Sequence, residues 1–336
     1  MKLRSIVSIF TLLFLAIGSV TTISAQASKY KISKAHKYKN LEIFLIHGKD
    51  QYSKKNILTL QEAMENKEFV VYETSNVNEL AVENLSKTND VFIQSGDIVK
   101  GGKQDRVLAV SIIIPANSGR ILIQAFCVES GRWEKRGKED NTKFSSSNDR
   151  IVTKKLKIAA NKSRSQQEVW SEVSKAQVKL AKKVGGSIAD KKSATSLQLS
   201  LEDEKVKANI DGYLDSLDNI IDGKRNVIGY AFAINGKINS ADVYVSNSLF
   251  KKLWLKMLKA AAIEAVANLN EKVRFNSVKP GEIQAFLLGA DRGKMSTQNV
   301  SKRSKVVTRE EKESVLFEAV DARRKIVVHK NYVSKQ

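Results

Sequence analysis

The chain has 336 residues, of which 42% are hydrophobic and 28% are charged, and its formal net charge is +21. This apolar content excludes a compositionally disordered protein and suffices for one large domain or two tightly packed ones. A single cysteine excludes an intrachain disulfide framework, and three histidines without paired spacing argue against a structural zinc site.

Residues 1–27 have the organisation of a secretory signal peptide. Lys2 and Arg4 form a short positive region, the apolar stretch Ile6–Val20 follows, and small residues provide cleavage sites near Ala25 or Ala27. The apolar stretch is shorter than the roughly 20 residues that a membrane-spanning helix needs, although a retained N-terminal anchor is the alternative. We therefore expect an exported protein, periplasmic or extracellular, with no membrane span after cleavage.

Residues 28–160 have the composition of a β-rich part. Leu41–Ile46 predicts the first strand, and a short helix from Thr59 to Asn66 follows, in which Glu62 completes a capping box. Further strands are predicted at Phe69–Glu73, Glu79–Val82, Val91–Gln94, Val107–Ile114 and Ile121–Val128, with turn residues at Pro115–Gly119. The polar stretch after Arg136, through Asp149, indicates a loop, and Lys155–Ala160 indicates one more strand. Short strands at this spacing predict a sandwich-like pair of sheets.

Residues 161–336 change to a helical period. Apolar residues from Val169 to Val184 recur at spacings of three and four, which predicts a helix from Ser165 that ends at Gly185. A second helix is predicted from Val206 to Ile221. Asn235-Gly236 then joins two β-rich runs, Asn226–Ile234 and Lys237–Val245, and is typical of a type I′ hairpin, because both turn residues need positive φ.

The last part of the chain alternates helices with a hairpin. The sequence predicts a long helix over Ser248–Asn270, a short helix over Glu282–Leu288, a polar loop over Arg292–Arg309, and a closing hairpin made of Ser314–Val320 and Lys325–His329. This order of elements predicts an α+β fold, in which a β-sandwich-like N-terminal sheet region packs with C-terminal helices and hairpins as one continuous domain of about residues 39–330.

The positive charge is concentrated between Arg150 and Lys183, where ten basic residues face only Glu168 and Glu172. One interpretation is a patch for anionic surfaces or phosphorylated ligands, and the other is a solvated helix face. No aromatic residues alternate with these charges, so a stacking platform for single-stranded nucleic acid is not indicated.

The first motif that packing does not explain is Gly101-Gly102-Lys103-Gln104-Asp105-Arg106. Two glycines let the backbone approach a ligand, Lys103 and Arg106 are suited to binding an anion, and Asp105 is suited to orienting Arg106 or acting as a base. The spacing of a nucleotide-triphosphatase loop is absent. The alternative is a tight turn with solvated charges.

The second motif is Cys127-Val128-Glu129-Ser130-Gly131-Arg132-Trp133. A carboxylate beside a thiol raises the pKa of the thiol, so we interpret Cys127 as buried and inert rather than as a nucleophile. Glu129 and Arg132 are interpreted as a charged pair that lines a pocket, with Trp133 as its wall. A structural salt bridge is the alternative.

The third motif is Gln166-Gln167-Glu168-Val169-Trp170, at the start of the first long helix. A carboxylate in a first helical turn complements the helix dipole, and free N–H groups there attract anions. Trp170 is typical of a core position, and His36, His47 and His329 are interpreted as surface or satisfied residues.

Taken in order, these three motifs resemble the ARG and rhodanese-phosphatase-superfamily-associated protein domain family, where ARG stands for ADP-ribosylglycohydrolase. The resemblance covers about Lys39 to Val328, and it departs from the family at Gln167, where a small residue is expected. It implies a ligand class related to ADP-ribose or phosphoesters and establishes no reaction. By residue match it implies ligand-binding roles for Gly102, Lys103, Gln104, Arg106, Arg132, Trp133, Gln167 and Trp170, and catalytic roles for Glu129 and Asp105.

Three functions remain open from the sequence. The first is a pocket that binds, and in one version processes, a phosphorylated nucleotide-like or ADP-ribose-related ligand between Gly101–Arg106 and Glu129–Trp133. Export argues against it, because free nucleotides are scarce outside the cytoplasm. The second is a non-enzymatic exported module that binds an anionic surface or a protein partner. The third, nucleic-acid binding, rests on charge alone. The sequence names no metal-binding residues, and it leaves cofactor and metal use open.

Overall fold

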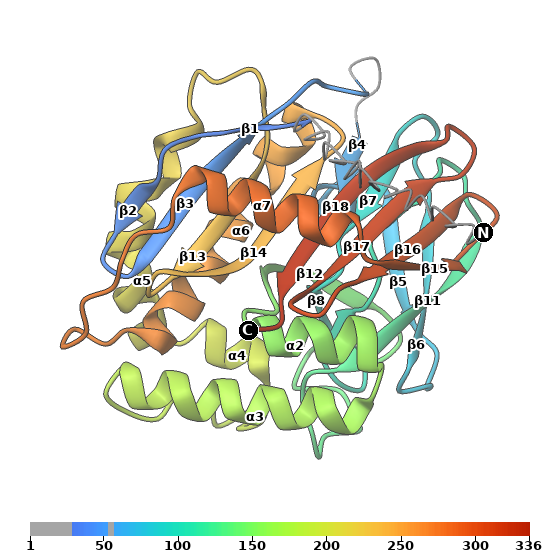
Figure 1. Ribbon diagram of the computed structural model, residues 1–336. Helices are drawn as coiled ribbons and strands as arrows, with labels where there is room; N and C mark the ends of the chain where they lie inside the picture. The colour runs from blue at the N-terminus through green and yellow to red at the C-terminus, as the bar shows by residue number, and fades with distance from the viewer. Residues whose placement is uncertain (1–28, 53–56) are drawn as a thin grey trace, which may run out of the picture.

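The computed structural model describes residues 29–52 and 57–336 (Figure 1). The signal-peptide prediction concerns residues 1–27 and lies outside the described residues. The fold is α+β, as the sequence predicts. No helix in the described part of the chain combines the length and apolarity that crossing a membrane requires.

Strands from the beginning and the end of the described residues pair in one large antiparallel sheet, which has nine strands there. Its order is β1-β3-β13-β14-β18-β17-β16-β15, with β2 also paired to β3. The strands are β1 (Lys31–Ile32), β2 (His36–Tyr38), β3 (Leu41–His47), β13 (Val227–Ile234), β14 (Lys237–Tyr244), β15 (Lys294–Asn299), β16 (Ser304–Glu310), β17 (Ser314–Asp321) and β18 (Ile326–Ser334). The predicted hairpin at Asn235-Gly236 is confirmed, with φ values of 52° and 71°.

The β-rich region between β3 and the first long helix forms two further sheets. The second sheet has the order β12-β8-β9-β11-β6-β5, and the third sheet has the order β10-β7-β4. The strands are β4 (Ile57–Thr59), β5 (Phe69–Glu73), β6 (Glu79–Asn84), β7 (Asp90–Ile93), β8 (Asp97–Gly101), β9 (Arg106–Leu108), β10 (Ile112–Ile114), β11 (Arg120–Cys127) and β12 (Phe144–Arg150).

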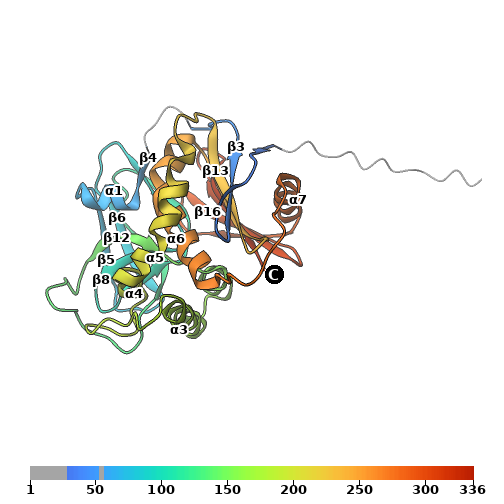
Figure 2. The same ribbon diagram turned by 90° about the vertical axis from the view of Figure 1, so that its left-hand side faces the viewer.

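Helices separate and cover these sheets. They are α1 (Leu60–Glu65), α2 (Lys154–Ile158), α3 (Gln166–Lys183), α4 (Leu197–Leu201), α5 (Glu204–Leu217), α6 (Asn247–Asn268) and α7 (Pro280–Asp291), with a π-helical turn at Ala159–Ser163 and a 3₁₀ turn at Asp218–Ile221. Figure 2 shows α6 between the large sheet and the second sheet, and α7 on the opposite face of the large sheet. Because it has sheets on both sides, α6 is buried over much of its circumference.

Four predictions from the sequence were wrong in detail. Lys155–Ala160 is not a strand but lies in α2 and the π turn, because the Thr153 hydroxyl accepts a hydrogen bond from the N–H of Leu156 and caps a helix there. Val107–Ile114 is not one strand, because the chain leaves the second sheet after β9 and enters the third sheet as β10. Both strands are buried and apolar, so the sequence gives no sign of the break between them.

The other two errors concern polar segments that were interpreted as loops. The stretch after Arg136 ends in β12, and Arg292–Arg309 contains β15 and most of β16. All residues of β15 are exposed, since it is the edge strand of the large sheet. A strand without a buried face has no alternating apolar pattern to reveal it.

Candidate functional site

The three motifs found in the sequence converge at one end of the second sheet. Gln166, the first residue of α3, uses its side-chain amide to pair with the backbone of Cys127 at the end of β11, through two hydrogen bonds of 2.8 Å. One turn later, the indole N–H of Trp170 donates to the carbonyl oxygen of Glu129 at 3.1 Å. The start of α3 therefore fixes the chain that carries Glu129.

Asp105 is the centre of this region, and its side chain is fully buried. Its carboxylate accepts hydrogen bonds from the N–H of Gly101 at 3.1 Å and from the hydroxyl of Ser196 at 2.8 Å. The guanidinium of Arg136 donates to both carboxylate oxygens, at 2.9 and 3.1 Å. The N–H of Asp105 donates to Oε2 of Glu129 at 3.1 Å, which joins the first motif to the second.

Glu129 is also fully buried and forms a bidentate pair with Arg132, at 2.8 Å from Nε and 2.6 Å from Nη2. Burial alone raises the pKa of this carboxyl group. Hydrogen bonds from Arg132, from the hydroxyl of Ser193 and from the N–H of Asp105 outweigh it, so the pKa of Glu129 lies below its ordinary value. Glu129 is therefore ionised and a weak base.

Arg136 continues the network towards the surface. Its Nε and Nη2 donate to Oε1 of Glu139, at 3.2 and 2.7 Å, in addition to its bonds with Asp105. Burial lowers the pKa of Arg136, but the hydrogen bonds and charges of Asp105 and Glu139 raise it above its ordinary value, so the guanidinium keeps its charge.

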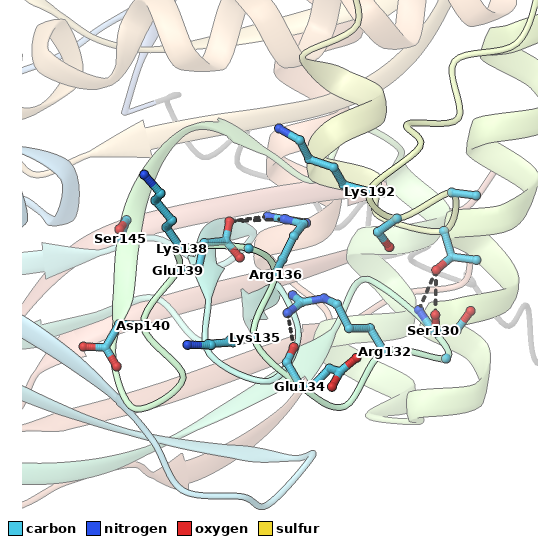
Figure 3. A pocket seen from close by; sticks show the side chains of 15 residues that line it. Ser130, Arg132, Glu134, Lys135, Arg136, Lys138, Glu139, Asp140, Ser145 and Lys192 are labelled. Carbon is cyan, nitrogen blue, oxygen red and sulfur yellow. Dashed lines mark hydrogen bonds and ion pairs between the residues drawn. The ribbon is translucent and has the colours of Figure 1, made fainter.

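A hollow of about 1150 Å³ opens above these arginines, lined by residues 130–132, 134–140, 145 and 192–195 (Figure 3). Its walls come from two loops, one following β11 and the other preceding α4. The basic side chains that line it are Arg132, Lys135, Arg136, Lys138 and Lys192, and the acidic ones are Glu134, Glu139 and Asp140. The three lysines are exposed. The walls thus carry a net positive charge, above the buried carboxylates Asp105 and Glu129.

Of the residues singled out in the sequence, Arg132 lines this hollow. Arg106 is fully buried on another side of the network, where it donates to the carbonyl oxygen of Val77 at 2.7 Å and pairs with Glu73 at 3.2 Å. Trp133 is 44% exposed but faces Lys103 and Arg106, whose Nζ and Cζ lie 5.1 and 5.8 Å from its ring centroid. Lys103 and Trp133 therefore form part of the protein surface beside the hollow.

The remaining candidates do not line the hollow. Gly102 has a φ of +56°, and an added Cβ would collide with the ring of Phe144, so the position needs glycine for structural reasons. Gln104 is buried, Gln167 is exposed, and Trp170 is partly buried against the backbone of Glu129. The first two motifs do meet, at the Asp105–Glu129 bond, but the hollow lies on the Arg132 side of that bond.

Cys127 lies below this network with its thiol buried. Burial raises the pKa of the thiol to about 11, against a smaller opposing effect from Arg106. At neutral pH the group is therefore a protonated thiol, which is a poor nucleophile. Within the described residues, no group of three or more His, Cys, Asp or Glu side chains is arranged to hold a metal ion.

Sequence reasoning missed Arg136, Ser196 and Lys192. Arg136 stands four residues after Arg132, and that repeated positive charge was a usable signal in a segment interpreted as a loop. Ser196 caps α4 and also bonds Asp105, from which it is separated by 91 positions. No local pattern reports a contact of that separation.

Comparison with known proteins agrees with the resemblance found in the motifs. The family model described as the ARG and Rhodanese-Phosphatase-superfamily-associated Protein domain matches residues 29–333. No curated protein and no solved structure gives a significant match. Because the match covers most of the chain, the protein belongs to the ARG and Rhodanese-Phosphatase-superfamily-associated Protein domain family.

Proposed function

We propose that the hollow beside Arg132 and Arg136 binds a small phosphorylated ligand, nucleotide-like or related to ADP-ribose. The observation that carries the proposal is the positively charged wall over two buried carboxylates, around a volume of about 1150 Å³. This volume slightly exceeds the roughly 300–1,000 Å³ of typical small-molecule sites, so it has room for a dinucleotide-sized ligand.

The two arginines and the lysines have different parts in this proposal. Arg132 and Arg136 already donate to Glu129, Asp105 and Glu139, so they fix the wall, and these carboxylates offset their charges. The direct donors to a phosphate are then the exposed ammonium groups of Lys135, Lys138 and Lys192. Figure 3 shows that Lys138 and Lys192 belong to the two different loops, so one ligand would bridge both.

The geometry favours binding over catalysis. A general base needs a lone pair directed at its substrate and a pKa near the working pH. Glu129 is fully buried with a lowered pKa, and the Asp105 carboxylate is occupied by Arg136, Ser196 and Gly101. Catalytic roles for Glu129 and Asp105 stay predictions that the geometry does not favour.

Calorimetric titration of the purified chain without residues 1–27 tests the ligand proposal, with ADP-ribose, ADP and adenosine as separate ligands. We expect ADP-ribose and ADP to bind and adenosine to fail, since adenosine lacks phosphate. The variant Lys138→Met/Lys192→Met removes one donor from each wall. Each charged hydrogen bond contributes about 1.5 kcal/mol, so the pair should weaken binding about a hundredfold.

Lys251→Met is the matched control, because Lys251 is an exposed lysine on α6 that does not line the hollow. It should leave the affinity unchanged. Failure of both phosphorylated ligands to bind at millimolar concentration, or equal losses in the double variant and the control, would contradict the proposal.

The alternative function, a non-enzymatic module that binds an anionic surface or protein partner through α3, has less support. Lys175 pairs with Glu172 at 2.7 Å, and Lys179 and Lys183 donate to Asn268 and the carbonyl oxygen of Leu269 at the end of α6. These lysines already have partners within the fold, which favours the solvated-face interpretation. Retention on a heparin column that disappears in a charge-reversed α3 variant would revive the alternative.

Export also remains a proposal. The full chain, produced in a bacterium with an outer membrane, should appear in the periplasm with a new N-terminus after Ala25 or Ala27. Edman sequencing of the purified protein checks this, and an intact Met1 in a membrane fraction would indicate the retained anchor.

A further inference from the structure

A second pocket lies at one corner of the large sheet, where β1 and β13 begin and β3 ends. It has a volume of about 730 Å³ and is lined by residues 29–31, 47–49, 51, 226 and 228. None of these residues lines the hollow beside Arg132. The volume lies within the roughly 300–1,000 Å³ of typical small-molecule sites. The pocket is therefore a separate candidate site with room for a small ligand.

An irregularity in the strand pairing forms the floor of this pocket. Between the residues that pair with His47 and Ile46 of β3, β13 has one extra residue, Ile228. Such a β-bulge bends the strand and redirects a side chain. The Ile228 side chain lies against Gly48, where an added Cβ would be only 2.4 Å from its Cδ1. Glycine at position 48 therefore makes the space that Ile228 occupies.

The floor is apolar and fixed in place. Ile228 and Tyr30 are buried, and both belong to the hydrophobic cluster that the large sheet forms with α7. The Tyr30 ring also borders Gly48, since its Cδ1 lies 3.4 Å from the Cβ position of that glycine. The N–H of Gly48 donates to the carbonyl oxygen of Asn226 at 2.9 Å. An apolar part of a ligand gains free energy by contact with this floor, because both surfaces are removed from water.

The rim of the pocket is basic. Three lysines line it, Lys29, Lys31 and Lys49, and all three are exposed. No acidic residue from the described part of the chain lines this pocket, whereas three line the hollow. The acidic neighbour of Lys49 in the sequence, Asp50, accepts a hydrogen bond of 2.8 Å from the N–H of Asn247 at the start of α6. The positive charge of the rim is therefore available to an anionic ligand.

His47 adds an oriented polar group to this rim. It pairs with Lys31 of β1, and directly opposite residues of neighbouring strands lie on the same face of a sheet. Its Nδ1 lies 3.0 Å from Oδ1 of Asn226. Because that oxygen only accepts, Nδ1 carries the ring hydrogen. The imidazole is therefore held in one orientation next to Lys31.

We propose that this pocket binds a small organic anion with an apolar body, of the kind represented by a medium-chain carboxylate. The lysines attract the head group by charge, and the floor formed by Tyr30 and Ile228 contacts the apolar body. A neutral apolar molecule would use only the floor, and a hydrophilic anion would use only the rim. We therefore expect tight binding to require both parts of the ligand.

Calorimetric titration of the chain without residues 1–27 tests this proposal. Any purification tag belongs at the C-terminus, because Lys29 lines the pocket. Decanoate is the probe, and decyltrimethylammonium is its control, since it has a similar chain and the opposite charge. We expect decanoate to bind and the cation to fail. Each buried methylene changes affinity about fourfold, so octanoate should bind about fifteenfold more weakly than decanoate when both methylenes are buried.

Lys31→Glu/Lys49→Glu places two negative charges on the rim and should weaken decanoate binding at least about tenfold. Lys34→Glu/Lys87→Glu is the matched control, because it changes the net charge equally at two exposed lysines that do not line the pocket. It should leave the affinity unchanged. Circular dichroism and Tm should show that both double variants are folded, since all four positions are exposed.

Three results would overturn the proposal. They are no binding of decanoate at millimolar concentration, equal affinities for decanoate and decyltrimethylammonium, and equal losses of affinity in the two double variants. None of these ligands contains phosphate, and neither double variant changes a residue of the hollow. The outcome is therefore independent of the ligand proposed for the hollow.

Discussion

Replacing Arg136 with methionine should strongly destabilise the fold, although Arg136 lies in a loop. The substitution removes the two hydrogen bonds of 2.9 and 3.1 Å that Arg136 donates to Asp105, and it leaves that carboxylate fully buried. Breaking a buried ion pair by removing one partner costs about 3–5 kcal/mol, because the remaining charge has lost its compensation. Asp105 keeps its bonds from Gly101 and Ser196 and an ion pair of 3.8 Å with Arg132, so we expect the lower end of that range, about 3 kcal/mol.

Urea denaturation followed by tryptophan fluorescence measures this loss as a shift in midpoint. Lys138→Met, two positions along the same loop, is the control, and as an exposed substitution it should change the free energy of unfolding by less than about 0.5 kcal/mol. The double variant Arg136→Met/Asp105→Leu should lose less free energy of unfolding than the sum of the two single losses, since neither charge of the pair is then left without its partner. A loss below about 1 kcal/mol for Arg136→Met would show that Asp105 does not need its partner.

Three further predictions concern neighbouring residues. The pKa of Glu129 is below its ordinary value of 4.5, so the ionised carboxylate stabilises the fold above that pH, and this stability is lost as the pH falls through the pKa of the folded state. In Glu129→Gln the free energy of unfolding, measured by urea denaturation, should therefore depend less on pH below 4.5. With the pKa of Cys127 raised to about 11, its thiol should react with Ellman's reagent at pH 8 only after unfolding, and rapid reaction of the native chain would contradict the buried thiol. Gly102→Ala should lower the Tm more than Gly119→Ala does, because both positions have positive φ but only the Cβ at position 102 collides with the ring of Phe144. Equal decreases in Tm would show that the Phe144 ring moves aside without cost.

The elements that the sequence predicted correctly are those whose signal is local. The capping box of Thr59 and Glu62 and the turn at Asn235-Gly236 each depend on a few adjacent residues, and both are confirmed. The strand β15 was missed because it is exposed on the sheet edge and has no apolar face. The helix α2 was mistaken for a strand because it is only five residues long, too short for a helical period to appear.

The residues of the candidate site likewise fall into those with a local sequence signal and those without one. The motifs drew attention to Asp105 and Glu129, because charged residues beside glycines at strand ends are unusual in a core. Their partners were not accessible to sequence reasoning, since Arg136 and Ser196 reach Asp105 across 31 and 91 positions. The buried hydrogen-bonded chain of Ser111, His329 and Asp242 was hidden for the same reason. Each residue looks ordinary in its own segment, and only the pairing of β14 with β18 and the break after β9 bring them together.

Asp105 explains why the hollow has a defined shape although both of its walls are loops. The wall that follows β11 is attached to this carboxylate through Arg136, and the wall that precedes α4 is attached to it through Ser196. Two loops of polar composition have few apolar contacts to hold them, so one buried anion with donors from both sides sets their separation. The Asp105 carboxylate therefore acts first as the structural anchor of the hollow, and a ligand that binds between the two walls adds a second bridge to the one that Asp105 already makes.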